Sequence, residues 1–150
     1  MPLAMKLSLA LSTVLALPAL AAVDSGHAGN LRILVTGIDS DAGAIQCALF
    51  SRDKGFPDRD SGVIQTKRYP ALPPMLTCTF DGVEPGRYAV AVTHDANGDE
   101  EVDADFEDGS DEAWGVTNNV RPGRRTPRFS EAAIYLSEGQ PSDYEVEIRR

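Results

Sequence analysis

The chain has 150 residues, of which 23 are acidic and 14 are Lys or Arg, for a formal net charge of −9. This acidic balance makes nucleic acids and anionic lipids poor partners, because their phosphates bind basic surfaces. The length supports one domain with a core of its own and is too short for two. Cations and neutral molecules are the partners that fit this charge.

The first residues have the features of a secretory signal peptide. A single cation, Lys6, precedes an apolar run over residues 7–17, and Pro18 ends that run just before a small-residue cleavage site. The run is shorter than the roughly 20 residues that cross a bilayer, so we expect no membrane insertion after cleavage. The predicted organisation is a signal peptide at 1–21, a flexible tail at 22–30 and a single domain at 31–150. We therefore predict a periplasmic or secreted protein.

After the tail, apolar and polar residues alternate in short runs separated by Gly, Pro, Asp and Asn. A period of two predicts β-strands whose apolar residues share one face, as Leu31, Ile33 and Val35 do. Seven such runs predict strands at residues 31–38, 44–50, 63–69, 75–80, 87–92, 132–136 and 144–148. The predicted fold is all-β: a seven-stranded antiparallel β-sandwich with one long acidic loop.

The two cysteines, Cys47 and Cys78, each share the parity of the apolar residues in their predicted strand. Both side chains should therefore point into the core, as a disulfide or as two small buried hydrophobic groups. Two cysteines are too few for a metal knuckle, and no Cys-x-x-Cys indicates redox chemistry. Parity leaves both alternatives open, since the sequence does not give the separation of the two Cα atoms.

The longest predicted loop runs from Asp95 to about Ser130, and it opens with ten carboxylates and no Lys or Arg between Asp95 and Glu112. Oxygen donors alternate at its start with the spacing of an EF-hand loop, and calcium takes about 6–8 oxygen ligands. The predicted ligands are the side chains of Asp95, Asn97, Asp99 and Asp103 with the carbonyl of Glu101. Calcium is the cofactor that this pattern predicts.

Two positions of this loop depart from the EF-hand pattern. Glu100 stands where such a loop has a glycine, and Phe106 stands where it has a bidentate glutamate. The alternative is a hairpin turn at Asn97-Gly98 within an acidic loop that is only solvated. Repulsion among the ten carboxylates favours the calcium hypothesis, because a divalent ion would offset it.

Enzymatic chemistry has little support in the sequence. His94 is the one credible general base, because His27 lies in the predicted tail. No nucleophile elbow, zinc-protease helix or phosphate-binding loop accompanies it. A metal-assisted enzyme that uses His94 and Asp95 is an alternative, but a histidine at a strand end is more often a hydrogen-bonding residue. We expect no catalytic residue and no enzymatic activity.

The single tryptophan, Trp114, lies near two amides, Asn118 and Asn119. An exposed aromatic side chain beside amides is typical of a carbohydrate- or peptide-binding site, so these three residues form a second candidate site. The competing interpretation makes Trp114 an apolar anchor that, with Phe106 and Phe129, packs the long loop onto the sheet. The exposure of the Trp114 ring separates the two.

Three segments, read in order, resemble a known family. They are "GVEPGRYAVAVTHDANGDEEVDADF", "EAWGVTNN" and "PRFSEAAIYLSEG", and the resemblance to the bacterial exported family called domain of unknown function 2141 spans about Leu31 to Arg149. The matching positions are Pro85, Gly86, Tyr88, His94, Asp95, Asn97, Asp99, Asp103, Gly115, Asn118, Asn119, Phe129 and Ala132. Glu100, Trp114 and Val116 depart from the family pattern.

The strand around Pro85-Gly86-x-Tyr88 is also similar to one in transthyretin-like and collagen-adhesin B-type sandwiches. The family resemblance implies a β-sandwich and an exported protein, and it supplies no mechanism. Together with the residues, it favours a monomeric binding or structural module with a calcium-binding acidic loop. Its partner would be a protein, a peptide or a glycan.

Overall fold

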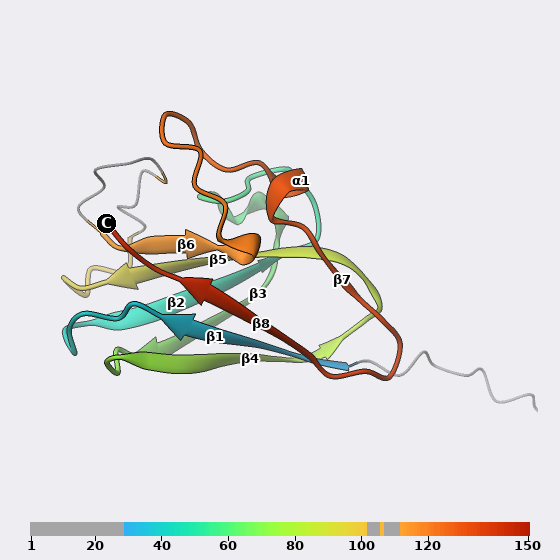
Figure 1. Ribbon diagram of the computed structural model, residues 1–150, viewed down its shortest axis with the longest axis horizontal. Helices are drawn as coiled ribbons and strands as arrows, with labels where there is room; N and C mark the ends of the chain where they lie inside the picture. Colours follow the sequence, from blue (N-terminus) through green and yellow to red (C-terminus); the bar gives the residue numbers. More distant parts are fainter. Residues whose placement is uncertain (1–28, 102–105, 107–111) are drawn as a thin grey trace, which may run out of the picture.

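Two β-sheets packed face to face form the protein (Figure 1). The computed structural model describes residues 29–101, 106 and 112–150. One sheet has the order β4 (Met75–Val83), β1 (Gly29–Thr36), β8 (Ser142–Glu147). The other has the order β3 (Val63–Pro70), β2 (Ala44–Phe50), β5 (Gly86–Asp95), β6 (Trp114–Val116), and β7 (Ile134–Leu136) pairs with the start of β5. The predicted β-sandwich is confirmed.

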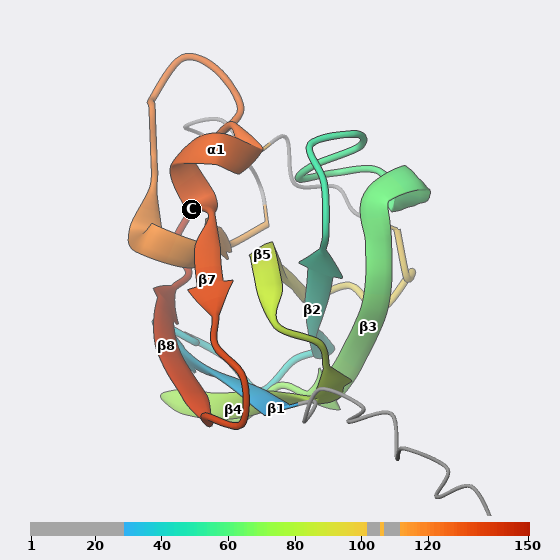
Figure 2. The same cartoon turned by 90° about the vertical axis from the view of Figure 1, so that its right-hand side faces the viewer.

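Short helical turns fill the connections: η1 (Asp60–Gly62), η2 (Thr117–Asn119) and α1 (Phe129–Ala132). Seen from the side, α1 and the three-stranded sheet lie on opposite sides of β5 (Figure 2). The predicted signal peptide and nearly all of the predicted tail lie outside the described residues. Gly29 and Asn30, placed in that tail by the sequence, already belong to β1.

The strand pairing differs from the prediction in two places. β1 pairs with β8 in parallel, with Ile33 opposite Tyr144, because β8 follows a crossover from the five-stranded sheet. An eighth strand, β6, lies inside the segment predicted to be an irregular loop. Alternation of apolar residues predicts that a strand exists, but it does not give the direction of its partner. The sandwich is therefore mainly antiparallel.

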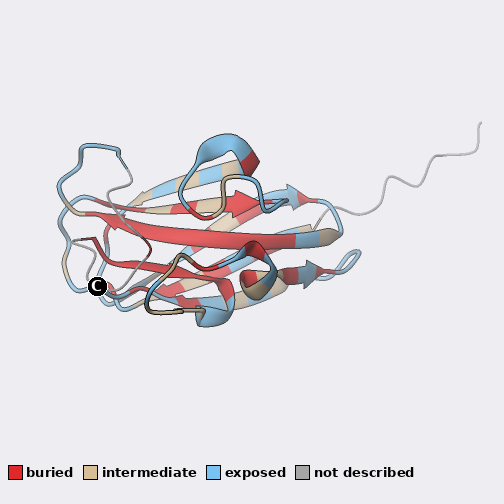
Figure 3. Ribbon diagram, turned by 90° about the horizontal axis from the view of Figure 1, so that it is seen from above, coloured by how far each residue is buried: buried red, intermediate tan, exposed pale blue. Residues whose placement is uncertain are grey.

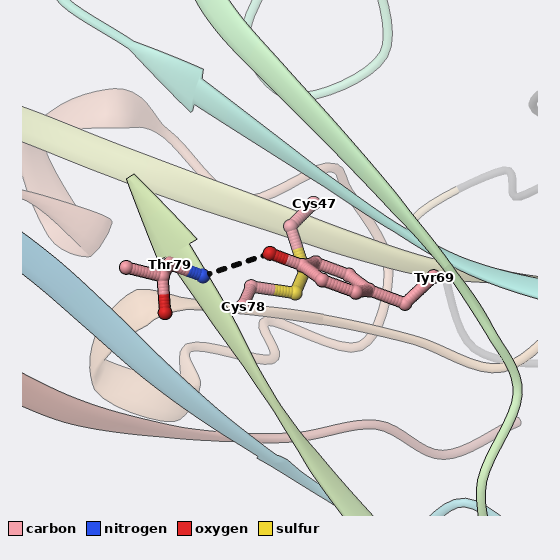
Figure 4. Close-up of a disulfide and its surroundings, with 4 residues drawn as sticks. All are labelled: Cys47, Tyr69, Cys78 and Thr79. Atoms are coloured by element: carbon pink, nitrogen blue, oxygen red, sulfur yellow. Dashed lines mark hydrogen bonds between the residues drawn. A yellow bond between two sulfur atoms is a disulfide. The ribbon is translucent and has the colours of Figure 1, made fainter. Parts of the chain in front are cut away.

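The core between the sheets follows the parity of the strands. Leu31, Ile33 and Val35 of β1 have no exposed surface, and they face buried residues of β2 and β5. Cys47 of β2 and Cys78 of β4 form a disulfide across this core, with their Cα atoms 6.6 Å apart. The hydroxyl of Tyr69 accepts a 3.2 Å hydrogen bond from the backbone N–H of Thr79 beside it (Figure 4). The bridge therefore ties the two sheets together covalently.

The five-stranded sheet is also covered on its other face. Every residue of β5 from Tyr88 to Asp95 is buried, and the strand runs as a continuous buried band (Figure 3). Its small alanines face a second apolar cluster, here called the outer cluster: Phe50, Ala89, Ala91, Phe106, Trp114, Val116, Phe129 and Ala132. The five largest side chains of this cluster are Phe50 of β2 and four that follow β5 in the chain: Phe106, Trp114, Val116 and Phe129. Phe106 and residues 114–132 are therefore part of the folded domain.

Candidate functional site

The acidic loop begins at the end of β5, where Asp95 leaves the sheet. The register places Asp95 opposite Ala44 of β2 and His94 opposite Ile45. Asp95 is 2% exposed, whereas Asn97, Gly98, Asp99, Glu100 and Glu101 are all exposed. The loop is therefore anchored at a buried carboxylate and projects into solvent from there.

Hydrogen bonds from the backbone to acidic and amide side chains shape this loop. Oδ1 of Asp95 accepts the N–H of Gly98 at 2.7 Å, and Oδ2 accepts the N–H of Glu100 at 3.2 Å. Oδ1 of Asn97 accepts the N–H of Asp99 at 3.2 Å, and Oδ1 of Asp99 accepts the N–H of Glu101 at 3.0 Å. Each of these side chains thus closes a tight turn with the residues that follow it, which is the geometry of turns capped by Asp and Asn.

The backbone at Glu100 is left-handed, with φ of 66°. Only glycine, asparagine and aspartate adopt this region readily, so a glutamate here carries strain. Glu100 occupies the position where an EF-hand loop needs a glycine for its sharp turn. The chain makes that turn without the glycine, because the carboxylate of Asp95 holds the Glu100 N–H.

Asp95 also has a cationic partner that the sequence did not reveal. Nη2 of Arg68 lies 2.6 Å from Oδ2 of Asp95, and the Arg68 side chain is 32% exposed. Burial opposes ionisation of Asp95, but the hydrogen bonds from Arg68, Gly98 and Glu100 outweigh it, so the pKa of Asp95 lies below its usual value. The carboxylate is therefore ionised at neutral pH.

Strand register explains why the sequence does not predict the pairing of Arg68 with Asp95. Arg68 of β3 lies opposite Gln46 of β2, and Gln46 lies opposite Thr93 of β5. Arg68 can reach Asp95 only across the width of β2, and the pattern of one strand does not contain that alignment. In the sequence, Arg68 is one polar residue of the predicted strand at residues 63–69.

The predicted calcium ligands are only partly brought together. Asp95, Asn97, Asp99 and Glu101 lie on one turn, but Asp103 lies outside the described residues. Nδ2 of Asn97 donates to Oδ2 of Asp99 at 2.7 Å, so these two side chains contact each other. Within residues 29–101, 106 and 112–150, no group of three His, Cys, Asp or Glu side chains is arranged to hold a metal. Calcium binding stays a prediction.

His94 is buried beneath the loop, with 1% of its surface exposed. Its Nε2 lies 2.8 Å from the carbonyl oxygen of Ala42, which can only accept, so Nε2 carries the proton. Its Nδ1 lies 3.9 Å from Oδ1 of Asp39 and has no hydrogen-bond partner among the described residues. The hydrogen bond from Nε2 of His94 to Ala42 joins the end of β5 to the turn before β2.

Trp114 is 1% exposed and lies in β6. Its ring packs against the ring of Phe106, with 5.2 Å between the two centroids. The guanidinium of Arg121 lies over the Trp114 ring, 3.8 Å from its centroid. Arg121 also donates to the carbonyl oxygens of Trp114 and Arg149, at 2.7 Å and 2.8 Å. The packing interpretation accounts for this burial, and a ligand-binding role of Trp114 stays untested.

The two amides near Trp114 bind backbone. Nδ2 of Asn118 donates to the carbonyls of Glu131 and Ala133, each at 3.0 Å. Oδ1 of Asn119 accepts the N–H of Glu147 in β8 at 2.8 Å. Both asparagines have left-handed backbones, with φ of 63° and 51°. They therefore fasten η2 to the segment around α1 and to the three-stranded sheet.

Gly115 lies where β6 approaches β8. A Cβ atom at this position would lie 2.4 Å from the carbonyl oxygen of Glu147. Only glycine permits such a close approach of two backbones. This contact explains why a glycine follows the tryptophan.

These features define a class: a disulfide-linked β-sandwich with an acidic loop at one end and a covered outer face. The chain belongs to the family described as "Uncharacterized protein conserved in bacteria (DUF2141)", whose sequence profile matches residues 33–143. The resemblance seen in the sequence is thereby confirmed. No curated protein and no solved structure gave a match to the chain.

The disulfide indicates the kind of compartment in which the protein folds. Bonds of this kind persist in oxidising surroundings, so Cys47–Cys78 indicates a protein that folds outside the cytoplasm. Among the described residues, no helix has the length and apolarity needed to span a bilayer.

Proposed function

We propose that this protein is an exported, monomeric binding or structural module, periplasmic or secreted, whose acidic loop binds calcium. One observation carries the proposal: the loop from Asp95 to Glu101 is already curved around its alternate oxygen-bearing side chains. A calcium ion at the centre of this curve would meet Asp95, Asn97 and Asp99, with the Glu101 carbonyl and Asp103 completing the set. The partner of such a module would be a protein, a peptide or a glycan.

The Arg68–Asp95 ion pair gives the proposal a specific consequence. Oδ2 of Asp95 is occupied by Arg68 at 2.6 Å, and the guanidinium places a positive charge beside the proposed ion. Calcium and Arg68 therefore compete for one carboxylate, which weakens calcium binding. An affinity of about 10⁻⁴–10⁻³ M, as in extracellular modules, is expected.

Calorimetry and thermal melting with and without calcium test the proposal. A ligand that binds only the native state stabilises it by about 1.4 kcal/mol at a tenfold excess over Kd. The melting temperature should rise in millimolar calcium, and the double variant Asp95→Ala with Asp99→Ala should remove the rise. No heat of binding, together with an unchanged melting temperature, would show that the loop is only solvated.

The variant Arg68→Gln tests the competition. It should bind calcium more tightly than the wild type, and without calcium it should lose about 2 kcal/mol of stability. A fully buried pair would cost about 3–5 kcal/mol, and the partial exposure of Arg68 reduces this. Arg32→Gln is the matched control, because it removes the same charge from an exposed ion pair with Asp143 on the other sheet. Equal affinities in the two variants would contradict a direct role of Arg68.

A further inference from the structure

A cavity of about 640 Å³ lies away from the acidic loop, where the loop after β2 faces the segment before α1. The residues that line it come from positions 51–56, from Arg87 in β5 and from positions 126–130. Its volume is within the range of about 300–1,000 Å³ that small-molecule sites occupy. The cavity therefore has the dimensions of a site for a small organic molecule.

The charges around this cavity oppose those of the whole chain. Three of its lining residues are arginines, Arg52, Arg87 and Arg128, and one is an acid, Asp53. The chain as a whole has a net charge of −9. This local excess of guanidinium groups attracts anions, whereas the acidic remainder of the protein repels them.

These arginines are not engaged in ion pairs within the part of the chain that the structure describes. Arg125, only three residues from Arg128, shows the contrast, because its guanidinium holds Glu131 at 2.7 Å. Arg52, Arg87 and Arg128 are exposed and retain N–H donors that match the two oxygens of a carboxylate or a phosphate.

Aromatic rings supply the apolar part of the cavity. Phe56 and Phe129 both line it, and they meet edge to face with 5.8 Å between centroids. The guanidinium of Arg87 lies over the Phe129 ring at 5.2 Å, which fixes a cation beside the aromatic wall. Phe129 belongs to the outer cluster, so a buried scaffold holds this wall in place.

Hydroxyl groups complete the lining. Ser51, Thr126 and Ser130 face the cavity from its two sides. A hydroxyl can donate to an anionic oxygen or accept from a ligand hydroxyl. A positive rim, an aromatic wall and a few hydroxyls are the groups that recognise an anionic head joined to an apolar body.

We propose that this cavity binds a small organic oxyanion, a phosphate or carboxylate joined to an aromatic or apolar body. Arg52, Arg87 and Arg128 bind the anionic group, and Phe56 with Phe129 contacts the body. The site is independent of the calcium loop, so either proposal can fail without the other.

Calorimetry in calcium-free Tris chloride tests this site with phenyl phosphate, phenylacetate, inorganic phosphate and the neutral benzyl alcohol. Phenyl phosphate or phenylacetate should bind more tightly than inorganic phosphate, and benzyl alcohol should give no measurable binding. Whichever of the two aromatic anions binds more tightly identifies the head group. Absence of heat from both at millimolar concentration overturns the proposal.

Variants locate the binding. The double variant Arg52→Gln with Arg87→Gln should weaken the aromatic anion at least about tenfold, because hydrogen bonds to charged groups are lost. Arg32→Gln on the other sheet is the control for net charge and should leave the affinity unchanged. Phe56→Ala should weaken the aromatic anion and leave inorganic phosphate unchanged. Equal affinity in the wild type and the double arginine variant would place binding elsewhere and overturn the proposal.

Discussion

The two faces of the five-stranded sheet are buried in different ways. The inner face meets another sheet, and strands with alternating side chains supply both sides of the contact. The outer face meets Phe106 and residues 114–132, and a few large side chains there cover a surface of small ones, Ala89 and Ala91. The inner face depends on many medium-sized residues, whereas the outer face depends on a few aromatic anchors.

This difference indicates which contacts hold the described residues after β5 in place. Among these described residues, only the short strand β6 joins the ladder of the five-stranded sheet before α1, so side-chain contacts must hold the rest in place. The guanidinium of Arg121 donates to the carbonyl oxygens of Trp114 in β6 and Arg149 after β8, and the side chains of Asn118 and Asn119 bind η2 to its neighbours. Polar side chains that bind backbone replace the missing ladder, while Trp114 and Phe129 provide the buried apolar surface.

The largest effect is expected for the anchor of the outer face. Trp114→Ala should lower the free energy of unfolding by about 3–5 kcal/mol, because it leaves a cavity beside Phe106 and removes the ring under Arg121. Urea unfolding measures this loss. Tyr135→Ala is the matched control, since its ring is 69% exposed and its removal should cost little. A loss below about 1 kcal/mol for Trp114→Ala would show that the outer face tolerates an empty anchor.

The inner face should respond next most strongly to loss of its covalent link. Replacing both Cys47 and Cys78 by Ala should cost about 3–4 kcal/mol, because the bridge closes a loop with a sequence separation of 31. Urea unfolding of this variant beside the oxidised wild type gives the difference. Thiol titration of the denatured, unreduced protein should find no reactive thiol, and two reactive thiols would contradict the bridge.

A smaller effect concerns the ion pair that closes the segment before α1. The hydrogen bond from Arg125, followed by that from the backbone of Arg128, lowers the pKa of Glu131 from 4.5 to about 2. A carboxylate with a depressed folded-state pKa contributes stability above its unfolded pKa and loses it as the pH falls. Stability from this pair should therefore decline between pH 4.5 and about pH 2.

Unfolding as a function of pH, compared with Glu131→Gln, isolates this contribution. The variant should be less stable than the wild type at neutral pH, and the difference should disappear near pH 2. Glu138→Gln serves as the control, because this exposed glutamate forms no ion pair among the described residues. A difference that persists unchanged to the lowest pH would show that the effect is not caused by charge.

Parity predicted the inner face well and the outer face poorly. The apolar residues at alternate positions of the predicted strands include Leu31, Ile33, Val35, Ile45, Leu49, Phe80, Val90, Ile134 and Val146, and all of these are buried. Leu76 has the same parity but is only half-buried near the start of β4. A period of two carries this information because each strand has one face toward the other sheet. Ala89 and Ala91 lie on the other face of β5, and parity alone does not show that the outer cluster covers them.

In the candidate sites, too, the sequence pattern does not predict contacts between distant residues. The sequence contained the acidic loop, but the Arg68–Asp95 pair requires the register of three strands. The cavity near α1 requires Arg52, Arg87 and Arg128 to meet from three distant segments. Local patterns predict elements and short loops, whereas contacts between distant residues follow from how the elements align.

The parallel pairing of β1 with β8 has a consequence for the order in which the chain folds. β1 is the middle strand of its sheet, and Arg32 meets Asp143 across a separation of 111 residues. As the chain enters the compartment where it folds, N-terminus first, β1 keeps one unpaired edge until β8 arrives. A topology dominated by such distant contacts folds slowly, and the open edge is a target for aggregation in the meantime. A chaperone that acts where the protein folds, and covers this edge until β8 is in place, would therefore raise the yield of native protein.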